Sequence, residues 1–304
     1  MTVYNLTQAD ETYSGFGATF GQLFADYGDI INIGYDNAHF SIFGAGVTIN
    51  YIGNGGSVVS SGYNTTIFSY GNGNHVQAYG AGDQIYMSGS GATSWGAGVV
   101  ITLGDYSYIA LYGDNNDGEL GASNSHINAN GNNSTVFLGG DNNSAIIAGD
   151  NGWIDSHGNG GSVVLYGSNN HMTRYGDNGI AIIETGAQNN YINVGNPDMN
   201  GSGDNNLIID HGSYTTLDLT GTHETVISLG EYITANSYGN YNTIYDYGMS
   251  GTLNLFDSNS LAYIYGDNTS ATIGNSAANT DVYLFGSNDV GVNNSYVGSN
   301  SHIY

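Results

Sequence analysis

Apolar and polar residues follow one another along this chain in a pattern that repeats every nine residues. Each unit has an apolar side chain four residues before a glycine and a second slot, apolar or small, two residues before it. A spacing of two is the period of a β-strand, so each unit is expected to form one short strand with alternate side chains on one face. The first apolar slot is occupied by Phe40, Ile49, Val58, Ile67, Val76, Ile85, Val100, Ile109, Val136, Ile154, Val163, Met172, Leu217, Val226, Ile244 and Leu253.

The glycine that closes each unit is usually followed by Asn, Asp or Ser. We expect this glycine to supply the positive-φ corner at which the chain turns toward the next strand. One unit cannot bury its apolar face alone, and stacked short repeats of this kind are typical of a β-helix or β-roll. The sequence therefore predicts an all-β fold, a single parallel β-solenoid over residues 28–304.

The charges in the second block indicate how many units make one coil. Read every 18 positions, the residue after the glycine alternates between acidic and neutral, giving the column Asp105, Ser123, Asp141, Asn159 and Asp177. A coil of three units would instead place Asp114 beside Asp141. Like charges one strand spacing apart, ~4.8 Å, repel each other. The pattern therefore favours an 18-residue coil made of two nonapeptide units.

Two segments depart from the repeat. Residues 1–27 precede it, and within them residues 2–6 are expected to form a strand outside the repeat. Phe16, Phe20 and Leu23 follow at helical spacing. We expect this segment to cap the first coil, with docking to another subunit as the alternative. Residues 196–206 contain the only proline and are expected to form an insertion loop.

Near the C-terminus the glycine spacing loosens, and the sequence ends at Tyr304 without a polar helix. The last coil of such a solenoid would leave strand edges open, and open edges pair with other chains. We therefore expect the chain to associate with itself, end to end.

Charge narrows the classes of partner. The chain has 26 acidic residues against one Lys or Arg, Arg174, for a formal net charge of −25. Nucleic acids and anionic membranes are bound through Lys and Arg, so both classes are excluded as partners. The sequence has no apolar run long enough for a transmembrane helix. It also lacks cysteine and shows no Sec-type signal, which favours a secreted bacterial protein exported by a Sec-independent route.

Three turns carry a resemblance to a known family. The stretches Leu138–Asn143, Ala148–Asn151 and Tyr265–Asn268 contain Gly-Asp-Asn and resemble the turns of bacterial β-rolls of the RTX-type calcium-binding nonapeptide family. That resemblance implies Ca²⁺ as a cofactor and type I secretion. The implied metal ligands are Asp105, Asp114, Asp141, Asp150, Asp177 and Asp267. In the alternative interpretation, Asp and Asn at these positions are turn formers that stack in hydrogen-bonded ladders.

No catalytic residues are predicted, because the eight histidines are scattered and none lies in a nucleophile motif. We therefore expect a non-enzymatic protein. The regular repeat predicts an extracellular structural subunit that assembles into a filament, surface layer or biofilm-matrix fibre. The alternatives are a monomeric adhesin that binds a polysaccharide or cell surface through its Tyr and Asn rows, and a carbohydrate-active enzyme. Tyrosines that directly precede the glycines, such as Tyr70 and Tyr247, are expected to face outward.

Overall fold

The fold consists of β-strands and turns. The computed structural model describes residues 2–5, 12–15, 20–71, 74–80, 82–87, 91–94, 98–102, 105–121, 123–194, 204–295 and 300–304. It contains two compact units, Met1–Ala145 and Ile146–Tyr304. Within the residues described, no helix is long and apolar enough to cross a membrane.

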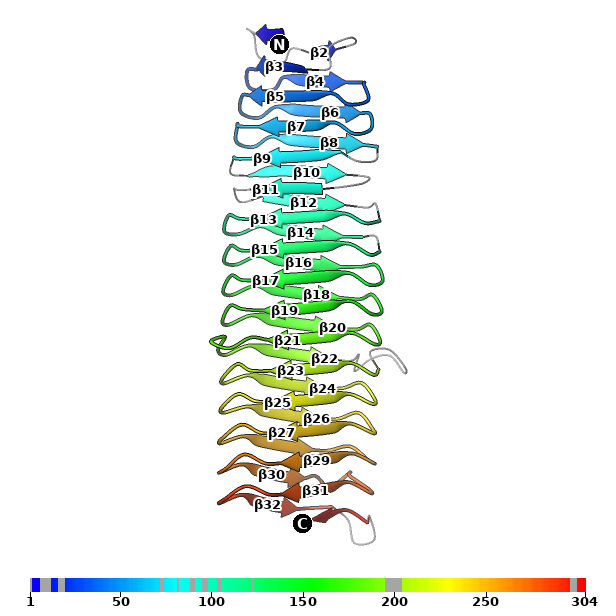
Figure 1. The fold of residues 1–304 in the computed structure, drawn as a ribbon, viewed down its shortest axis with the longest axis vertical. Helices are drawn as coiled ribbons and strands as arrows, with labels where there is room; N and C mark the ends of the chain where they lie inside the picture. The colour runs from blue at the N-terminus through cyan, green and yellow to red at the C-terminus, as the bar shows by residue number, and fades with distance from the viewer. Residues whose placement is uncertain are drawn as a thin grey trace. The chain divides into compact units, whose positions relative to one another are not determined.

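The first unit winds its strands into two parallel sheets, here called the odd and the even sheet after the strand numbers. Figure 1 shows β5 and β7 pointing one way and β6 and β8 the other. The odd sheet contains β1 (Thr2–Asn5), β3 (Phe20–Phe24), β5 (His39–Phe43), β7 (Ser57–Ser60), β9 (His75–Ala78), β11 (Gly91–Ser94), β13 (Tyr108–Leu111) and β15 (His126–Ala129). The even sheet contains β2 (Thr12–Gly15), β4 (Ile30–Ile33), β6 (Thr48–Ile52), β8 (Thr66–Tyr70), β10 (Asp83–Met87), β12 (Gly98–Thr102), β14 (Asp117–Leu120) and β16 (Thr135–Leu138). Strand β17 is Ser144–Ile147.

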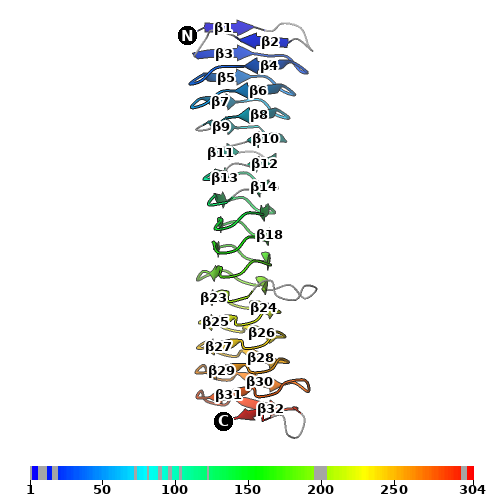
Figure 2. The same cartoon turned by 90° about the vertical axis from the view of Figure 1, so that its right-hand side faces the viewer.

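The second unit repeats this architecture, and Figure 2 shows its two sheets edge on, facing each other across the core. The odd sheet contains β19 (Ser162–Leu165), β21 (Ile180–Ile183), β23 (Leu207–Asp210), β25 (Thr225–Ser228), β27 (Thr243–Asp246), β29 (Leu261–Ile264), β31 (Asp281–Leu284) and β33 (His302–Ile303). The even sheet contains β18 (Trp153–Ser156), β20 (His171–Arg174), β22 (Tyr191–Val194), β24 (Thr216–Leu219), β26 (Thr234–Ser237), β28 (Thr252–Leu255), β30 (Ser270–Ile273) and β32 (Val290–Asn293).

Strand register confirms the 18-residue coil and the parallel β-solenoid. Tyr108 pairs with His126 in the first unit, and Thr225 pairs with Thr243 in the second. The step is longer between β21 and β23, where Ile180 pairs with Leu207. The extra residues lie between β22 and β23, where the insertion was predicted, although most of the range 196–206 lies outside the described residues.

The predicted core positions are confirmed. Most strands bury every second side chain, and the sixteen residues of the first apolar slot are all buried. The second slot is buried as well, but it is not uniformly apolar: Leu111 and Leu219 fill it in some coils, and Ser228, Asp210 and Asp246 in others. Each coil therefore adds one apolar layer and one layer of mixed polarity to the interior.

The prediction for the repeat glycines is wrong in its mechanism. Among the described glycines of the repeat only Gly71 has a positive φ, 123°. The left-handed residue instead comes two positions later, as at Asn115 and Tyr232, with φ of 59° and 58°. The glycine is required by close approach between coils, because a Cβ on Gly239 would lie 1.8 Å from the carbonyl oxygen of Gly221. Asn tolerates the left-handed region by bonding locally, whereas Tyr rarely occupies it.

Where the N-terminal segment is described, it forms strands and no helix. Strand β3 pairs with β1 and with β5, and β2 pairs with β4, so the solenoid includes strands from Thr2 onward. Neither the separate strand over residues 2–6 nor the helical spacing is confirmed, and Phe16 lies outside the described residues. The edge of β5 offers β3 a full row of backbone hydrogen bonds, and Leu23 is fully buried in that coil. These long-range contacts outweigh the local helical spacing.

Candidate functional site

The six aspartates implied as calcium ligands lie at the turns, each separate from the others. Three lie in the first unit, where the Asp105 carboxylate accepts a hydrogen bond from the Ser123 amide at 2.9 Å and Asp114 accepts one from the Asn132 amide at 2.7 Å. Asp141 lies above Ser123 in the same column and donates its own amide to the Ser123 hydroxyl at 3.1 Å.

The other three aspartates lie in the second unit and make the same kind of hydrogen bond. The carboxylates of Asp150, Asp177 and Asp267 accept backbone amides from the next coil at 2.6, 2.9 and 2.7 Å. No group of three or more His, Cys, Asp or Glu suited to a metal ion occurs among the residues described. The aspartates therefore form rungs of a hydrogen-bonded ladder, as in the turn-former interpretation.

We expect Ca²⁺ to stabilise the protein only as a general counterion. A dedicated Ca²⁺ site takes six to eight oxygens, while five of these aspartates already bind backbone through one carboxylate oxygen. Millimolar Ca²⁺ should therefore raise the midpoint of thermal unfolding by screening the net charge of −25, and equal Mg²⁺ should do the same. Differential scanning calorimetry with Ca²⁺ and Mg²⁺ at equal ionic strength, against chelated protein in low-salt buffer, measures this. A rise specific to Ca²⁺ would restore the dedicated sites.

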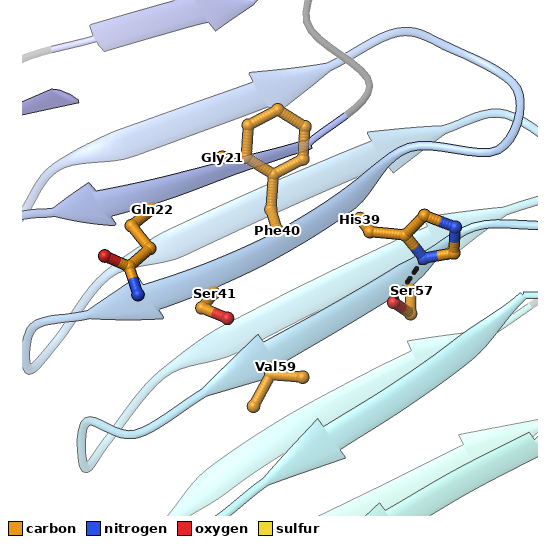
Figure 3. A pocket seen from close by; sticks show the side chains of 7 residues that line it. All are labelled: Gly21, Gln22, His39, Phe40, Ser41, Ser57 and Val59. Atoms are coloured by element: carbon orange, nitrogen blue, oxygen red, sulfur yellow. Dashed lines mark hydrogen bonds between the residues drawn. The ribbon is translucent and has the colours of Figure 1, made fainter. Parts of the chain in front are cut away.

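A pocket of about 200 Å³ lies on the first unit over β3, β5 and β7. In Figure 3 the ring of Phe40 lies beside Gly21, which has no side chain to fill the space, and His39 Nδ1 is 2.7 Å from the hydroxyl of Ser57. The same contact recurs at 2.7 Å between His126 and Ser144, again 18 residues apart. We interpret it as a contact between stacked coils, because it recurs between a His and a Ser that are one coil apart.

The outward surface of the odd sheet in the second unit, here called the odd face, is unusually apolar. Its central column is formed by the third residue of each strand and its border column by the residue after the strand. The central column contains Val164, Ile182, Ile209, Ile227, Tyr245, Tyr263 and Tyr283, all half-buried. The exposed apolar residues of the border column are Tyr166, Leu229, Tyr247, Tyr265 and Phe285.

Rings on the odd face stack from coil to coil. In the central column Tyr263 lies 5.2 Å from both Tyr245 and Tyr283, measured between ring centroids. In the border column Tyr265 lies 4.8 Å from Tyr247 and 5.0 Å from Phe285. These distances lie in the range of favourable offset stacking, which holds the rings in one orientation. The outward orientation predicted for Tyr70, Tyr247 and related tyrosines is confirmed.

The odd face carries little charge in a strongly acidic chain. Along β23, β25, β27 and β29 neither the central nor the border column contains Asp or Glu. The central column reads Ile, Ile, Tyr, Tyr, and the border column reads His, Leu, Tyr, Tyr. Carboxylates do occur elsewhere on the odd face, at Glu184 in the border column after β21 and at Asp281, which lies 3.1 Å from the imidazole of His302. Acidic residues are thus absent from the two columns between β23 and β29.

Arg174, the single Lys or Arg of the chain, is the last residue of β20. It points inward and is 1% exposed. The Nε of Arg174 donates to Asn206 Oδ1 at 2.9 Å, and the backbone amide of Asn206 donates to the Glu224 carboxylate at 2.9 Å. Asn206 therefore bridges the cation to a buried acid. Burial lowers the pKa of Arg174 and raises the pKa of Glu224 to about 8. The cluster is enclosed by backbone: a Cβ on Gly179 would meet the guanidinium at 1.7 Å.

Sequence reasoning missed the odd face and the Arg174 cluster for different reasons. The sequence shows Tyr245, Tyr263 and Tyr283 at similar spacing. However, the step from Tyr263 to Tyr283 is longer than the step from Tyr245 to Tyr263, so the regular repeat does not place all three in one column. The partner of Arg174 lies beyond the insertion, where the coil length cannot be read from the repeat.

Comparison with known proteins gives no family. No family model matches the chain, and no curated protein matches it. One solved structure, a hyper-glycosylated fragment of TibA whose glycosylation is catalysed by TibC, aligns over 99% of each chain at 10% identity with a TM-score of 0.29. We infer nothing about function from so distant a likeness.

Proposed function

We propose that this protein is an extracellular structural subunit, without enzymatic activity, that associates with copies of itself into a filament, surface layer or matrix fibre. The odd face of the second unit supports the proposal. Monomeric soluble proteins rarely expose contiguous apolar patches larger than a few hundred Å². Here an apolar and aromatic surface continues over successive coils from Val164 to Phe285.

The size of the odd face matches that of a stable interface. The odd sheet of the second unit has eight strands. In a typical coil the first and third residues of the strand face outward, and so does the residue that follows the strand. This gives roughly 20 residues, within the ~20–30 residues per partner of a standard interface. Two flat sheets pack face to face at ~10 Å with interdigitated side chains, and ridges of Ile and Tyr at coil spacing suit that geometry.

Electrostatics favours this surface as the contact. Copies of a chain with a net charge of −25 repel one another, and a contact that buried carboxylates would add a desolvation cost. A face without carboxylates from β23 to β29 brings copies together while the acidic turns remain in solvent. End-to-end pairing stays a prediction from the sequence, and the odd face adds lateral pairing to it.

We expect Ile227→Asp to weaken assembly at least tenfold. The variant places a carboxylate in the centre of the odd face, where pairing would bury it without a partner. Analytical ultracentrifugation over a concentration series and electron microscopy of the same samples measure the effect. Thr234→Asp is the matched control, because it adds the same charge at a half-buried outward position on the even sheet of the same unit.

Two outcomes would contradict the proposal. Wild-type protein that stays monomeric at physiological ionic strength up to millimolar concentration would leave the odd face without a role in assembly. Equal weakening by Ile227→Asp and Thr234→Asp would show that added charge acts through general repulsion. Circular dichroism of both variants confirms that the solenoid is intact.

A further inference from the structure

We infer that the even sheet of the second unit carries a binding site for a neutral polysaccharide, on the outward surface of β18, β20, β22 and β24. This site lies on a different sheet from the odd face and does not rest on self-association. Three rings form its base, Trp153, His171 and Tyr191, which are consecutive partners in the sheet register. We call them the aromatic stack.

The aromatic stack is ordered and open to solvent. The rings of Trp153 and His171 lie 3.9 Å apart at an interplanar angle of 10°, and those of His171 and Tyr191 lie 4.7 Å apart at 22°. The Tyr191 hydroxyl donates a hydrogen bond to Asp218, which fixes that end of the stack. Trp153 is 51% exposed although His171 covers one face of its indole. About half of the Trp153 side chain is therefore open to a ligand.

Hydrogen-bonding groups lie directly beside the stack. The outward residues two positions further along the same strands are Asp155, Thr173, Asn193 and Asp218. Asp218 also begins a ladder, since Asn236 donates its side-chain amide to Asp218 at 2.8 Å. Asn193 Oδ1 has no hydrogen-bond partner within the protein, and such an unpaired acceptor costs about 1–3 kcal/mol. A small movement of this amide would let a ligand hydroxyl satisfy it.

This combination fits a sugar ring better than a protein or an ion. A pyranose has an apolar C–H face that packs on an aromatic ring and a rim of hydroxyls that need donors and acceptors beside it. The aromatic stack provides the ring for the C–H face of the sugar. The column of Asp155, Thr173, Asn193 and Asp218 provides hydrogen-bonding groups for its hydroxyls. Rings on the odd face, by contrast, lie among Ile and Leu side chains, which would leave the hydroxyls of a sugar unpaired.

The same residues set the class of polysaccharide. Carboxylates at Asp155 and Asp218, in a chain of net charge −25, repel uronates and sulfated sugars, so the ligand is neutral. The surface is an open sheet whose columns repeat at each coil, so an extended chain can contact several coils at once. Multiple weak contacts along one chain then add through effective concentration.

Native affinity electrophoresis tests the site. The probes are hydroxyethylcellulose, mixed-linkage β-glucan and dextran as neutral polymers, and alginate as an acidic one, each cast into the gel. The Ile227→Asp background keeps self-association from contributing to retardation. We expect at least one neutral polymer to retard the protein, alginate to have no effect, and Trp153→Ala to weaken retardation at least tenfold.

Two further variants separate binding from stability. Tyr232→Ala is the matched control, because Tyr232 is also half exposed, at 47%, and stacked, at 4.8 Å on Tyr214, but lies outside the proposed site. Trp153→Phe keeps an aromatic ring and should retain part of the affinity. The chain has two tryptophans, so Trp95→Phe leaves Trp153 as the fluorescent reporter, and its emission should shift when the polymer is added.

No retardation by any neutral polymer would overturn the inference, and so would equal retardation of Trp153→Ala and the parent protein. Retardation by alginate alone would overturn the neutral class. Each of these results leaves the assembly proposal untouched, because that proposal is tested by sedimentation without polysaccharide. Unchanged thermal unfolding of Trp153→Ala excludes a general loss of structure as the cause.

Discussion

Replacing Gly230 by alanine is expected to lower the free energy of unfolding by about 3 kcal/mol or more. A Cβ at this position would lie 1.5 Å from the carbonyl oxygen of Gly212, which belongs to the backbone of the preceding coil. That atom cannot rotate away as a side chain can, so the two coils must separate locally. The separation would lengthen neighbouring hydrogen bonds, such as the one from the Leu229 amide to Asp210 at 2.7 Å.

The matched control is Gly186→Ala. Gly186 has a φ of 98°, so alanine is strained there, but a Cβ would meet nothing within 4 Å. Its cost should be limited to conformational strain, roughly 1–2 kcal/mol. Urea unfolding followed by circular dichroism gives the midpoint of each variant, which is the safer measure because long repeat arrays need not unfold in two states. Similar midpoints for the two variants would show that contact between coils is not what requires the glycine.

This glycine also marks what the sequence could and could not predict. Periodicity alone predicted the strands, the buried slots and the 18-residue coil, because each follows from side-chain alternation and charge spacing within a column. The role of the glycine was misjudged because positive φ and close approach both select glycine and give the same pattern. Only the stacked turns distinguish them, with Tyr232 rather than Gly230 in the left-handed region.

The surfaces were harder to predict than the core. Alternation shows that Tyr245 faces outward but not which outward residues of other coils lie beside it, since several longer steps interrupt the repeat. The aromatic stack illustrates the difficulty: Trp153 and His171 are one regular coil apart, but Tyr191 follows after a longer step. In the absence of the register, a Trp, a His and a Tyr at unequal spacing carry no signal of a site.

The interior acids predict that the protein becomes more stable as the solution becomes more acidic. Burial raises the pKa of Asp210 to about 6 and that of Glu224 to about 8. Glu224 is fully buried, and Asp204 nearby adds to the increase while Arg174 partly offsets it. The Asp210 carboxylate accepts the Gly212 amide at 2.8 Å through one oxygen, and its other oxygen has no hydrogen-bond partner, so ionisation there is poorly compensated.

The sign of the effect follows from linkage. Both groups bind a proton more tightly in the folded protein than in the unfolded chain, where the pKa values are 3.8 for Asp and 4.5 for Glu. Their contribution to stability is therefore complete below about pH 4 and is lost as the pH rises, up to about 6 for Asp210 and about 8 for Glu224. At ~1.4 kcal/mol per pKa unit, Glu224 alone accounts for a decrease on the order of 5 kcal/mol.

Glu224→Gln should remove most of this pH dependence. Glutamine keeps a carbonyl oxygen to accept the Asn206 amide, which donates to Glu224 at 2.9 Å, but it has no charge to desolvate. Chemical unfolding of wild type at pH 5 and pH 8 should show a clearly higher midpoint at pH 5. The variant should match wild type at pH 5 and exceed it at pH 8. Asp267→Asn, at an exposed turn, should leave the wild-type pH slope intact. A wild-type midpoint that rises from pH 5 to pH 8 would show that Glu224 is held ionised in the core, with the field of Arg174 outweighing its burial.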